Sequence, residues 1–474
     1  MEKLFDKPYF YWFHAINQIP RGSYNEEAIS NFLKKFAEDR QLEVIQDEAK
    51  NIIIHKPASP GWENSPWVTL QGHMDMVCEK LPESTHDFSK DPIEMSVDGD
   101  WIKANKTTLG ADDGIAVAYA LALLDAKDIP HPNLEVIITT AEETGMDGAQ
   151  ALKAEDVKGE FLLNLDSETE GIFTLGCAGG ADFHASFDLE LENAGKEPVY
   201  QLDISGLKGG HSGQVIHEGR GNAIKILARI LHQVAAKEKL HLVKLTGGSK
   251  HNAIPTQAQA IFQAGGQVEQ VIKAAFEEVH AELQLVDPDL TYTLSQAQAD
   301  QRIVLDQTQQ ILDYLFVLPH GVQSMSPAMH GLVQTSLNVA IVTQEKHSLD
   351  LQISIRSAVN SSKLELVDRL MTLTPYFGAQ PEAGGQYPAW EFNPESPFID
   401  KVQKIYQDLY QEEAKITAIH AGLECGLLKN IMPNTEMISF GPTMEDIHTP
   451  RERLNISSTN RVWDFLLKLL ASFK

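Results

Sequence analysis

Short apolar runs alternate with helical segments in the first third of this 474-residue chain. The predicted strands cover residues 42–47, 51–56, 67–72, 134–140 and 160–166, and a predicted helix covers 113–126. Several of the runs are apolar on both faces, which is typical of a parallel sheet covered by helices on each side. The sequence therefore predicts an α/β domain with a mostly parallel central sheet.

A further helix is predicted before the first strand, over residues 23–42. Ser23 and Glu26 match the spacing of a capping box, in which each side chain bonds the backbone of the other residue. Helical spacing of apolar residues follows, at Ile29, Leu33 and Phe36. We expect this helix to begin at Ser23.

The pattern changes after residue 180. Between residues 181 and 385, alternating strands such as 349–357 are mixed with amphipathic helices such as 222–237 and 268–283. This mixture predicts an inserted α+β domain with an antiparallel sheet. From residue 386 onward helices and strands alternate again, so we expect residues 386–474 to complete the domain that residues 1–180 begin.

Composition excludes several classes of function. The formal net charge of −27 argues against a nucleic-acid or anionic-membrane partner, because both present negative phosphate. The three cysteines are far apart, which excludes a disulfide framework or a thiolate zinc site. No secretory signal is visible, and the longest apolar run, 116–124, is far shorter than the roughly 20 residues of a membrane span. We expect a soluble, cytoplasmic protein.

Histidine and acidic side chains recur where the predicted strands end. They are His73, Asp75, Glu142, Glu143, Asp166 and His448. The carboxyl ends of strands form the edge at which open parallel sheets build their ligand sites. Side chains two residues apart in a strand point to the same side, so His73 and Asp75 can act on one site.

These residue types predict a metal centre. Imidazole and carboxylate without thiolate suit catalytic zinc, with cobalt or manganese as substitutes. A further acid pair, Asp112 and Asp113, lies in a glycine-containing turn. Together these groups exceed the needs of one ion and fit two metals about 3.5–4 Å apart. In the pair Glu142 and Glu143, one acid would bind metal and the other would act as general base; a helix N-terminal acid pair is the structural alternative.

Seven motifs, in order, resemble the aminoacyl-histidine dipeptidases, also called Xaa-His or cytosol nonspecific dipeptidases. The motifs are GHMDMV, TTLGADDGIAVA, TAEETGMDGA, LNLDSE, GLKGGHSG, HAGLECG and FGPTMEDIHTP. This family belongs to a wider clan of dinuclear zinc aminopeptidases and carboxypeptidases. The resemblance covers nearly the whole chain. It implies a catalytic domain built from residues 1–180 and 386–474, with residues 181–385 as an inserted lid.

The resemblance also implies a ligand set for two Zn²⁺ ions per subunit. His73, Asp112 and Asp166 would hold one metal. Asp112, Glu143 and His448 would hold the other, with Asp112 as the bridge. Asp113 stands where some relatives carry Asn, and we expect it to shape the turn without binding metal.

Further roles follow by position in the motifs. Asp75 would orient His73, Glu142 would activate a metal-bridged water, and His211 in the GGHSG motif would stabilise the tetrahedral oxyanion. The implied reaction is the hydrolysis of dipeptides with a free N-terminus, including Xaa-His dipeptides such as β-alanyl-histidine.

Three residues are candidates for binding this small-molecule substrate. Arg356 resembles the lid arginine that binds the terminal carboxylate, Asn252 is a second candidate, and Glu424 would bind the free amino group. The chain would act as a monomer or a homodimer. Two alternatives remain: an amidohydrolase of N-acyl amino acids with the same metal site, and a metal-dependent binding protein without activity.

Overall fold

The computed structural model describes all residues, Met1–Lys474. Internal contacts divide the chain into two compact units. Unit 1 comprises Met1–Gly176, Phe392–Ala418 and Leu423–Lys474, and unit 2 comprises Cys177–Glu391 and Ile419–Gly422. The sequence patterns did not anticipate the short return of Ile419–Gly422 to unit 2. The catalytic and lid ranges stay a prediction, because compactness alone does not assign a role to a unit.

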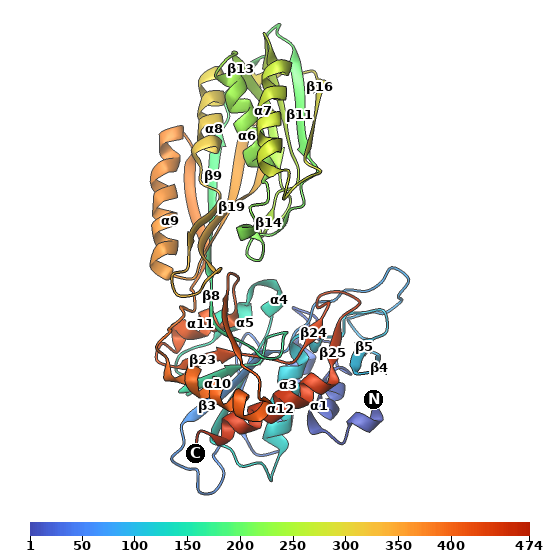
Figure 1. Ribbon diagram of the computed structural model, residues 1–474. Helices are drawn as coiled ribbons and strands as arrows, with labels where there is room; N and C mark the ends of the chain where they lie inside the picture. The colour runs from blue at the N-terminus through green and yellow to red at the C-terminus, as the bar shows by residue number, and fades with distance from the viewer. The chain divides into compact units, whose positions relative to one another are not determined.

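Unit 1 is built around an eight-stranded sheet with the order β1-β2-β6-β3-β7-β23-β8-β22 (Figure 1). Its strands are β1 (Glu43–Gln46), β2 (Ile52–Lys56), β3 (Trp67–His73), β6 (Asn133–Thr139), β7 (Phe161–Asn164), β8 (Ile172–Cys177), β22 (Lys415–Ile419) and β23 (Glu436–Ser439). The central strands β6, β3, β7 and β23 are parallel. Strands β1 and β2 pair antiparallel with their neighbours, and β8 pairs antiparallel with β23. The predicted α/β class with a parallel central sheet is confirmed.

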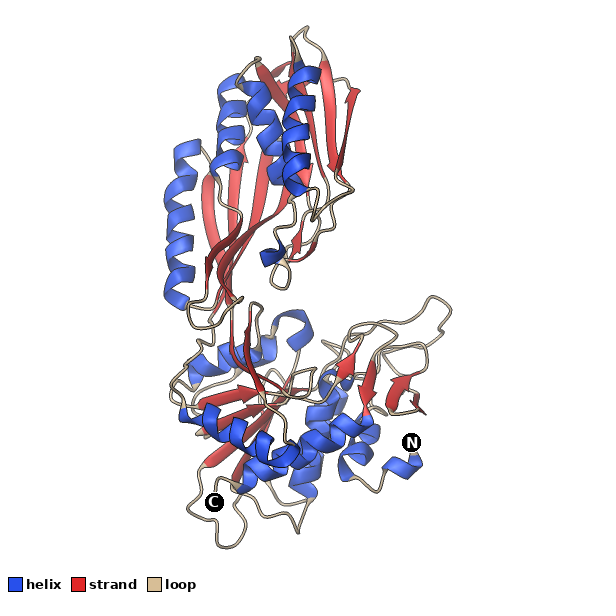
Figure 2. Cartoon of the chain, viewed as in Figure 1, coloured by secondary structure: helices blue, strands red, loops and turns tan.

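Helices cover this sheet, and a small sheet lies beside them (Figure 2). The helices are α1 (Pro8–Ile16), α2 (Glu27–Glu38), α3 (Ala111–Asp125), α4 (Glu142–Gly145), α5 (Asp147–Ala151), α10 (Pro397–Tyr410), α11 (Glu424–Ile431) and α12 (Ile456–Ala471). The small sheet has the order β24 (Met444–Glu445), β25 (Arg453–Asn455), β5 (Trp101–Ala104) and β4 (Met95–Asp98). Helix α3 is apolar on all sides and is buried along almost its whole length, in contact with α1 and β3.

The predicted start of the first long helix is wrong. Helix α2 begins at Glu27, and Glu26 makes no side-chain capping bond to it. The Ser23 hydroxyl instead donates to Oδ2 of Asp75 at 2.8 Å, and Glu26 accepts from the N–H of Ala141 at 3.0 Å. Partners distant in the sequence therefore outcompete the local capping box.

Unit 2 contains an antiparallel sheet with the order β16-β11-β15-β13-β19-β20-β9-β21, and β18 pairs with β19. The strands of this sheet are β9 (Gly179–Asp188), β11 (Val199–Ser205), β13 (Leu240–Gly247), β15 (Ala258–Ala264), β16 (Thr291–Gln296), β18 (Gly321–Met325), β19 (Val333–Gln344), β20 (Ser348–Ser357) and β21 (Gln380–Tyr387). Two short pairs also occur, β10 (Leu191–Asn193) with β17 (Gln301–Ile303), and β12 (Gly210–His211) with β14 (Ala253–Ile254).

Four long helices pack on this antiparallel sheet (Figure 2). They are α6 (Ala223–Ala235), α7 (Val268–Leu283), α8 (Leu305–Val317) and α9 (Asn360–Leu373). Their apolar residues and those of the strands form one continuous core. The predicted α+β composition of this region is confirmed. None of the helices in the chain is long and apolar enough to cross a bilayer.

Candidate metal centre

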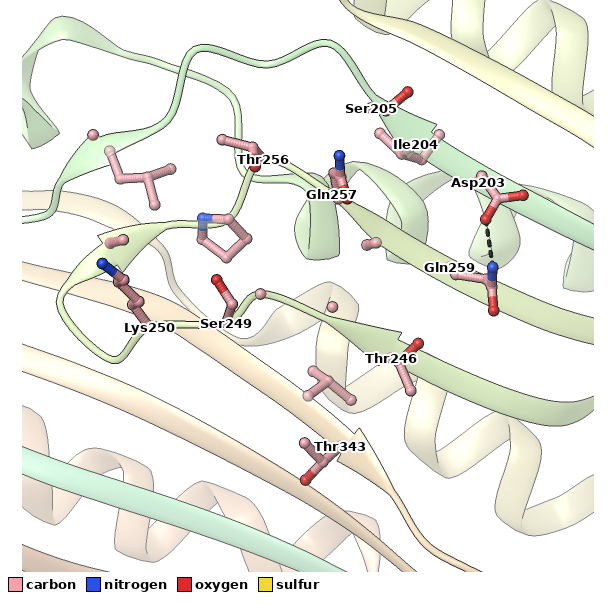
Figure 3. Close-up of a pocket in the computed structure, with 18 residues that line it drawn as sticks. Asp203, Ile204, Ser205, Thr246, Ser249, Lys250, Thr256, Gln257, Gln259 and Thr343 are labelled. Atoms are coloured by element: carbon pink, nitrogen blue, oxygen red, sulfur yellow. Dashed lines mark hydrogen bonds between the residues drawn. The ribbon is translucent and has the colours of Figure 1, made fainter. Parts of the chain in front are cut away.

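One polar cavity of unit 2 does not contain the predicted site. This cavity of about 580 Å³ is lined by residues of β11, β13, β15 and β19 and by the segment between β13 and β15 (Figure 3). Its wall includes Asp203, which accepts a hydrogen bond from Gln259 at 2.6 Å. None of the residues predicted from the sequence lines it, so the candidate site lies elsewhere.

The parallel strands of unit 1 place the candidate metal ligands at one edge of the sheet. His73 is the last residue of β3, Glu143 lies in α4 just after β6, and Asp166 follows β7. Asp112 lies in the first turn of α3, and His448 follows the short strand β24. Because the carboxyl ends of parallel strands meet at one edge, residues distant in the sequence come together there.

Asp112 lies between the two histidines. One oxygen, Oδ1, is 3.2 Å from Nε2 of His73, and the other, Oδ2, is 3.0 Å from Nε2 of His448. His73 Nε2 is also 3.7 Å from Asp166, and His448 Nε2 is 3.0 Å from Glu143. Since each carboxylate oxygen of Asp112 faces a different imidazole, Asp112 has the placement of a bridging ligand.

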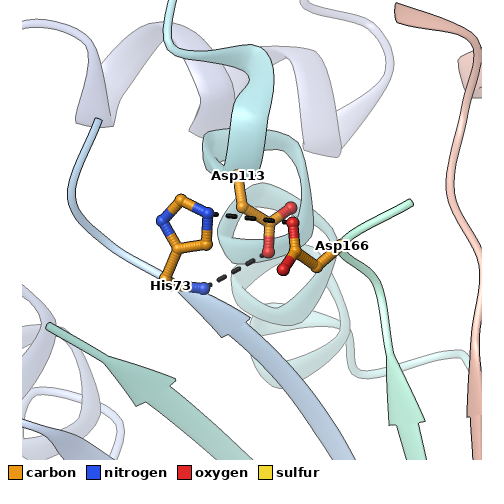
Figure 4. A group of neighbouring side chains, drawn as sticks. All are labelled: His73, Asp113 and Asp166. Atoms are coloured by element: carbon orange, nitrogen blue, oxygen red, sulfur yellow. Dashed lines mark hydrogen bonds and ion pairs between the residues drawn. The ribbon is translucent and has the colours of Figure 1, made fainter. Parts of the chain in front are cut away.

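Asp113 also belongs to this cluster. Potential ligand atoms of His73, Asp113 and Asp166 lie within 4.8 Å of one another (Figure 4). The Oδ2 atom of Asp113 accepts a hydrogen bond from the backbone N–H of His73 at 3.2 Å, and its buried Oδ1 has no hydrogen-bond partner. The peptide bond that joins Asp112 to Asp113 is cis. From the sequence, Asp113 was expected only to shape the turn, and its contact with His73 was not predicted.

In two further groups of residues, the potential ligand atoms also lie within 4.8 Å of one another. One contains His73, Glu142 and Glu143, and the other contains Asp112, Glu143 and His448. The second group is the ligand set that the family resemblance implies for one metal. The group of His73, Glu142 and Glu143 places the predicted general base, Glu142, beside one member of each implied ligand set.

Asp75 connects His73 with the first turn of α4. Its buried carboxylate lies 3.4 Å from Nδ1 of His73 and accepts the backbone N–H groups of Glu142 at 3.1 Å and Glu143 at 3.4 Å. The hydroxyl of Ser23 donates to the same carboxylate. Asp75 therefore holds both an imidazole and the backbone of the two glutamates in place.

The electrostatics of this cluster favour a bound cation. Burial raises the pKa of Glu142 to about 8, and the neighbouring carboxylates of Glu424, Glu143 and Asp112 act in the same direction. Hydrogen bonds to Asp112 and Glu143 raise the pKa of His448 to about 10. Carboxylates gathered away from water are costly unless positive charge compensates them. Together with the unpartnered oxygen of Asp113, the donor set fits divalent metal ions.

Glu424 lies at the start of α11, also in unit 1. Its side chain is fully buried, and Oε2 accepts hydrogen bonds from Thr139 at 2.7 Å and Gln71 at 2.5 Å. Burial raises the pKa of Glu424 to about 7. The other oxygen, Oε1, has no hydrogen-bond partner. Glu424 therefore keeps one acceptor atom free for a donor from a ligand.

Unit 2 holds the other candidate residues, and the first is His211 on β12. Its Nδ1 atom accepts the backbone N–H groups of Gly213 at 3.2 Å and Gln214 at 3.3 Å. Burial lowers the pKa of His211, and the charge of Arg356 acts in the same direction, so both effects favour the neutral ring. With Nδ1 as acceptor, the single ring proton lies on Nε2, which is then a hydrogen-bond donor.

Arg356 is a buried cation without an anionic partner. It lies on β20 with 9% of its surface exposed, and it donates to the hydroxyl of Tyr387 at 3.3 Å. Its Nε has no hydrogen-bond partner, and no carboxylate of the chain forms a salt bridge with it. Asn252 is exposed beside β14, and its carbonyl accepts the N–H of Ser212 at 2.8 Å. A guanidinium without a counterion is able to form charge-assisted hydrogen bonds with a carboxylate.

His420, which was not predicted as a site residue from the sequence, lies close to these residues in unit 2. His420 is 7% exposed, and its Nε2 is 2.7 Å from the hydroxyl of Ser336. Burial lowers the pKa of His420 to about 3, and the nearby Arg356, His217 and His211 add to this effect. His420 is the first residue of the HAGLECG motif, and its place in that motif is a sequence signal for it.

A sheet edge that gathers two histidines and several carboxylates is the arrangement that metal-dependent hydrolases use. Residues 69–472 match the model of peptidase family M20/M25/M40. The chain belongs to this family and is therefore a metallopeptidase, as predicted.

Relatives of this chain support the same assignment. It is 39% identical to a protein of Escherichia coli (strain K12) named cytosol non-specific dipeptidase, over 99% of this chain and 98% of that one. The crystal structure of aminoacylhistidine dipeptidase from Vibrio alginolyticus superposes with a TM-score of 0.92, at 38% identity, over 98% of this chain and 96% of that one. The resemblance drawn from the seven motifs is confirmed.

A more distant structure shows likeness of fold alone. Aminopeptidase PepT from Bacillus cereus has a TM-score of 0.57 at 16% identity, over 98% of both chains. The α/β architecture is thus shared well beyond the range of evident sequence similarity.

Proposed function

We propose that this protein hydrolyses dipeptides with a free N-terminus, including Xaa-His dipeptides such as β-alanyl-histidine. The observation that carries the proposal is the placement of Asp112 between His73 and His448, with the acid Glu142 beside them. The names of the Escherichia coli and Vibrio alginolyticus relatives support a dipeptide as substrate. The word cytosol in the first name supports our expectation of a cytoplasmic enzyme.

We assign the metal ligands as the sequence motifs imply. His73, Asp112 and Asp166 would hold one divalent ion, and Asp112, Glu143 and His448 a second. Imidazole and carboxylate donors suit Zn²⁺, with Co²⁺ or Mn²⁺ as substitutes. When bound, such ions supply positive charge that lowers the pKa of the attacking water and polarises the scissile carbonyl.

The residues around the ligands would carry the proton and the developing charge. Glu142 takes a proton from the attacking water and delivers it to the leaving amine. Asp75 keeps His73 and the first turn of α4 in place, which fixes the position of Glu142. The Nε2–H of His211 donates a hydrogen bond to the oxyanion of the tetrahedral intermediate.

Three residues would define the two ends of the substrate. Arg356 has no counterion and would bind the terminal carboxylate, with exposed Asn252 as a further contact. Glu424 has a free acceptor oxygen and would bind the amino group.

The first test measures hydrolysis of a small panel by chelated protein, before and after Zn²⁺, Co²⁺ or Mn²⁺ is restored. The panel contains β-alanyl-histidine, glycyl-histidine, leucyl-glycine and an N-acetylated dipeptide. We expect metal-restored cleavage of the free-amine dipeptides only. Cleavage of the acetylated compound alone would assign the chain to the N-acyl amino acid hydrolases. Metal binding without any cleavage would favour the alternative of a metal-dependent binding protein without activity.

The role of His211 can be tested by replacing the donor at Nε2. We expect His211→Ala to lower kcat by about 10²–10³-fold with little change in KM, because the donor acts mainly in the transition state. The variant His211→Gln carries an amide N–H at a similar reach and should retain part of the rate. Equal losses in both variants, or a change confined to KM, would contradict the oxyanion role.

A further inference from the structure

The segment that carries His448 also holds the backbone of Asp112. Glu452, four residues after His448, is 3% exposed. Its two carboxylate oxygens accept four consecutive backbone N–H groups, those of residues 109–112, at distances of 2.7, 3.0, 2.7 and 3.3 Å. One segment therefore supplies one candidate ligand and fixes the main chain of another.

A second buried charged residue, Arg21, connects the turn at residues 109–112 to the end of β3, where His73 lies. The guanidinium of Arg21, 2% exposed, donates to the carbonyls of Met74 at 3.1 Å and Asp75 at 3.2 Å. It also donates to the carbonyl of Gly110. The Arg21 side chain thus spans the segment after His73 and the turn before Asp112.

The backbone at Gly110 leaves space for the Arg21 side chain. Gly110 has a φ of 68°, a conformation that favours glycine, and a Cβ atom there would collide with the Arg21 guanidinium. Asn17, 1% exposed, completes the contact: its Oδ1 accepts from Arg21 at 2.9 Å, and its Nδ2 donates to the carbonyl of Leu109 at 3.2 Å. All these groups lie within unit 1.

We infer that Glu452 and Arg21 are positioning residues that hold Asp112 in place relative to His73 and His448. They thereby set the affinity of this centre for metal ions. The inference rests on the ligand roles proposed above. A carboxylate that binds two ions at once tolerates little movement of its backbone. Groups that orient metal ligands therefore affect the affinity for the metal. The competing explanation is structural: Glu452 only satisfies free N–H groups at the start of α3.

The test compares Zn²⁺ binding by the wild-type protein and Glu452→Gln, both full-length. Competition with a chromophoric chelator gives the number of ions and their dissociation constants, and thermal unfolding of the metal-free protein gives stability. We expect Glu452→Gln to weaken Zn²⁺ binding about 10- to 100-fold. A single amide oxygen cannot replace both acceptor atoms of the carboxylate.

Glu135 offers a matched control. It lies near the amino end of β6, is fully buried, and accepts the backbone N–H groups of Lys158 at 2.8 Å and Gly159 at 3.2 Å. We expect Glu135→Gln to lower the unfolding temperature of the metal-free protein without changing Zn²⁺ affinity. The contrast between the two variants separates ligand positioning from general stability.

Wild-type affinity for both ions in Glu452→Gln would overturn the inference and leave Glu452 as a helix cap. Should that variant fail to fold, Glu452→Asp keeps the charge on a shorter side chain, and unchanged Zn²⁺ affinity there would overturn it equally. A wild-type protein that binds no metal would refute both the metal centre and this inference. A wild-type protein that binds two ions but cleaves no dipeptide would refute the proposed function alone.

Discussion

Replacement of Glu142 by Gln is expected to lower kcat by about 10²–10⁴-fold, the usual contribution of a general base. The amide cannot accept a proton from the attacking water. The backbone N–H of residue 142 still donates to Asp75, so the first turn of α4 should keep its position. The measurement is kcat for a dipeptide together with the metal content of the purified variant.

The adjacent residue provides the contrast. Glu143 lies 3.0 Å from His448 and is a proposed ligand, so Glu143→Gln should lose metal as well as activity. Glu142→Gln should lose activity with its metal retained. Near-normal turnover by a metal-replete Glu142→Gln protein would refute the assignment of the base.

Replacement of Arg356 by Ala is expected to raise KM for dipeptides about 10- to 100-fold. This change corresponds to the free energy of one hydrogen-bonded contact to a charged group. Dipeptides whose C-terminus is amidated carry no terminal charge, so their KM should change far less. The measurement is the ratio of KM values for each dipeptide and its amide, in the wild-type and variant proteins.

Arg302 serves as the control for loss of a partly buried arginine from unit 2. Unlike Arg356, it has a carboxylate partner, Glu192, at 2.9 Å. Arg302→Ala should therefore affect stability and leave the ratio of KM values unchanged. Equal effects of Arg356→Ala on dipeptides and amides would mean that Arg356 does not bind the terminal carboxylate.

Local sequence patterns predicted much of the α/β scaffold. The apolar run that ends at His73 is strand β3, and the run before Glu142 is strand β6. These predictions succeed because burial on both faces of a parallel sheet demands a continuous apolar run. The polar residue that ends each run then lies at the sheet edge where ligands bind.

Local patterns failed where a polar side chain had a distant partner. Ser23 and Glu26 match a capping box, yet they bond Asp75 and the backbone of Ala141. Asp113 was expected only to shape a turn, although it contacts the backbone of His73. In each case the competing hydrogen bond joins segments that are far apart in the sequence, so no local spacing reveals it.

The sequence by itself determined the class of each unit, the family, and which histidines and acids stand at strand ends, because all of these follow from periodicity and motif order. Only the tertiary structure decided which oxygen of Asp112 faces which imidazole, that Arg356 has no counterion, and that Glu452 holds the turn before Asp112. These features depend on distances between side chains from different segments, and those distances exist only once the core has packed.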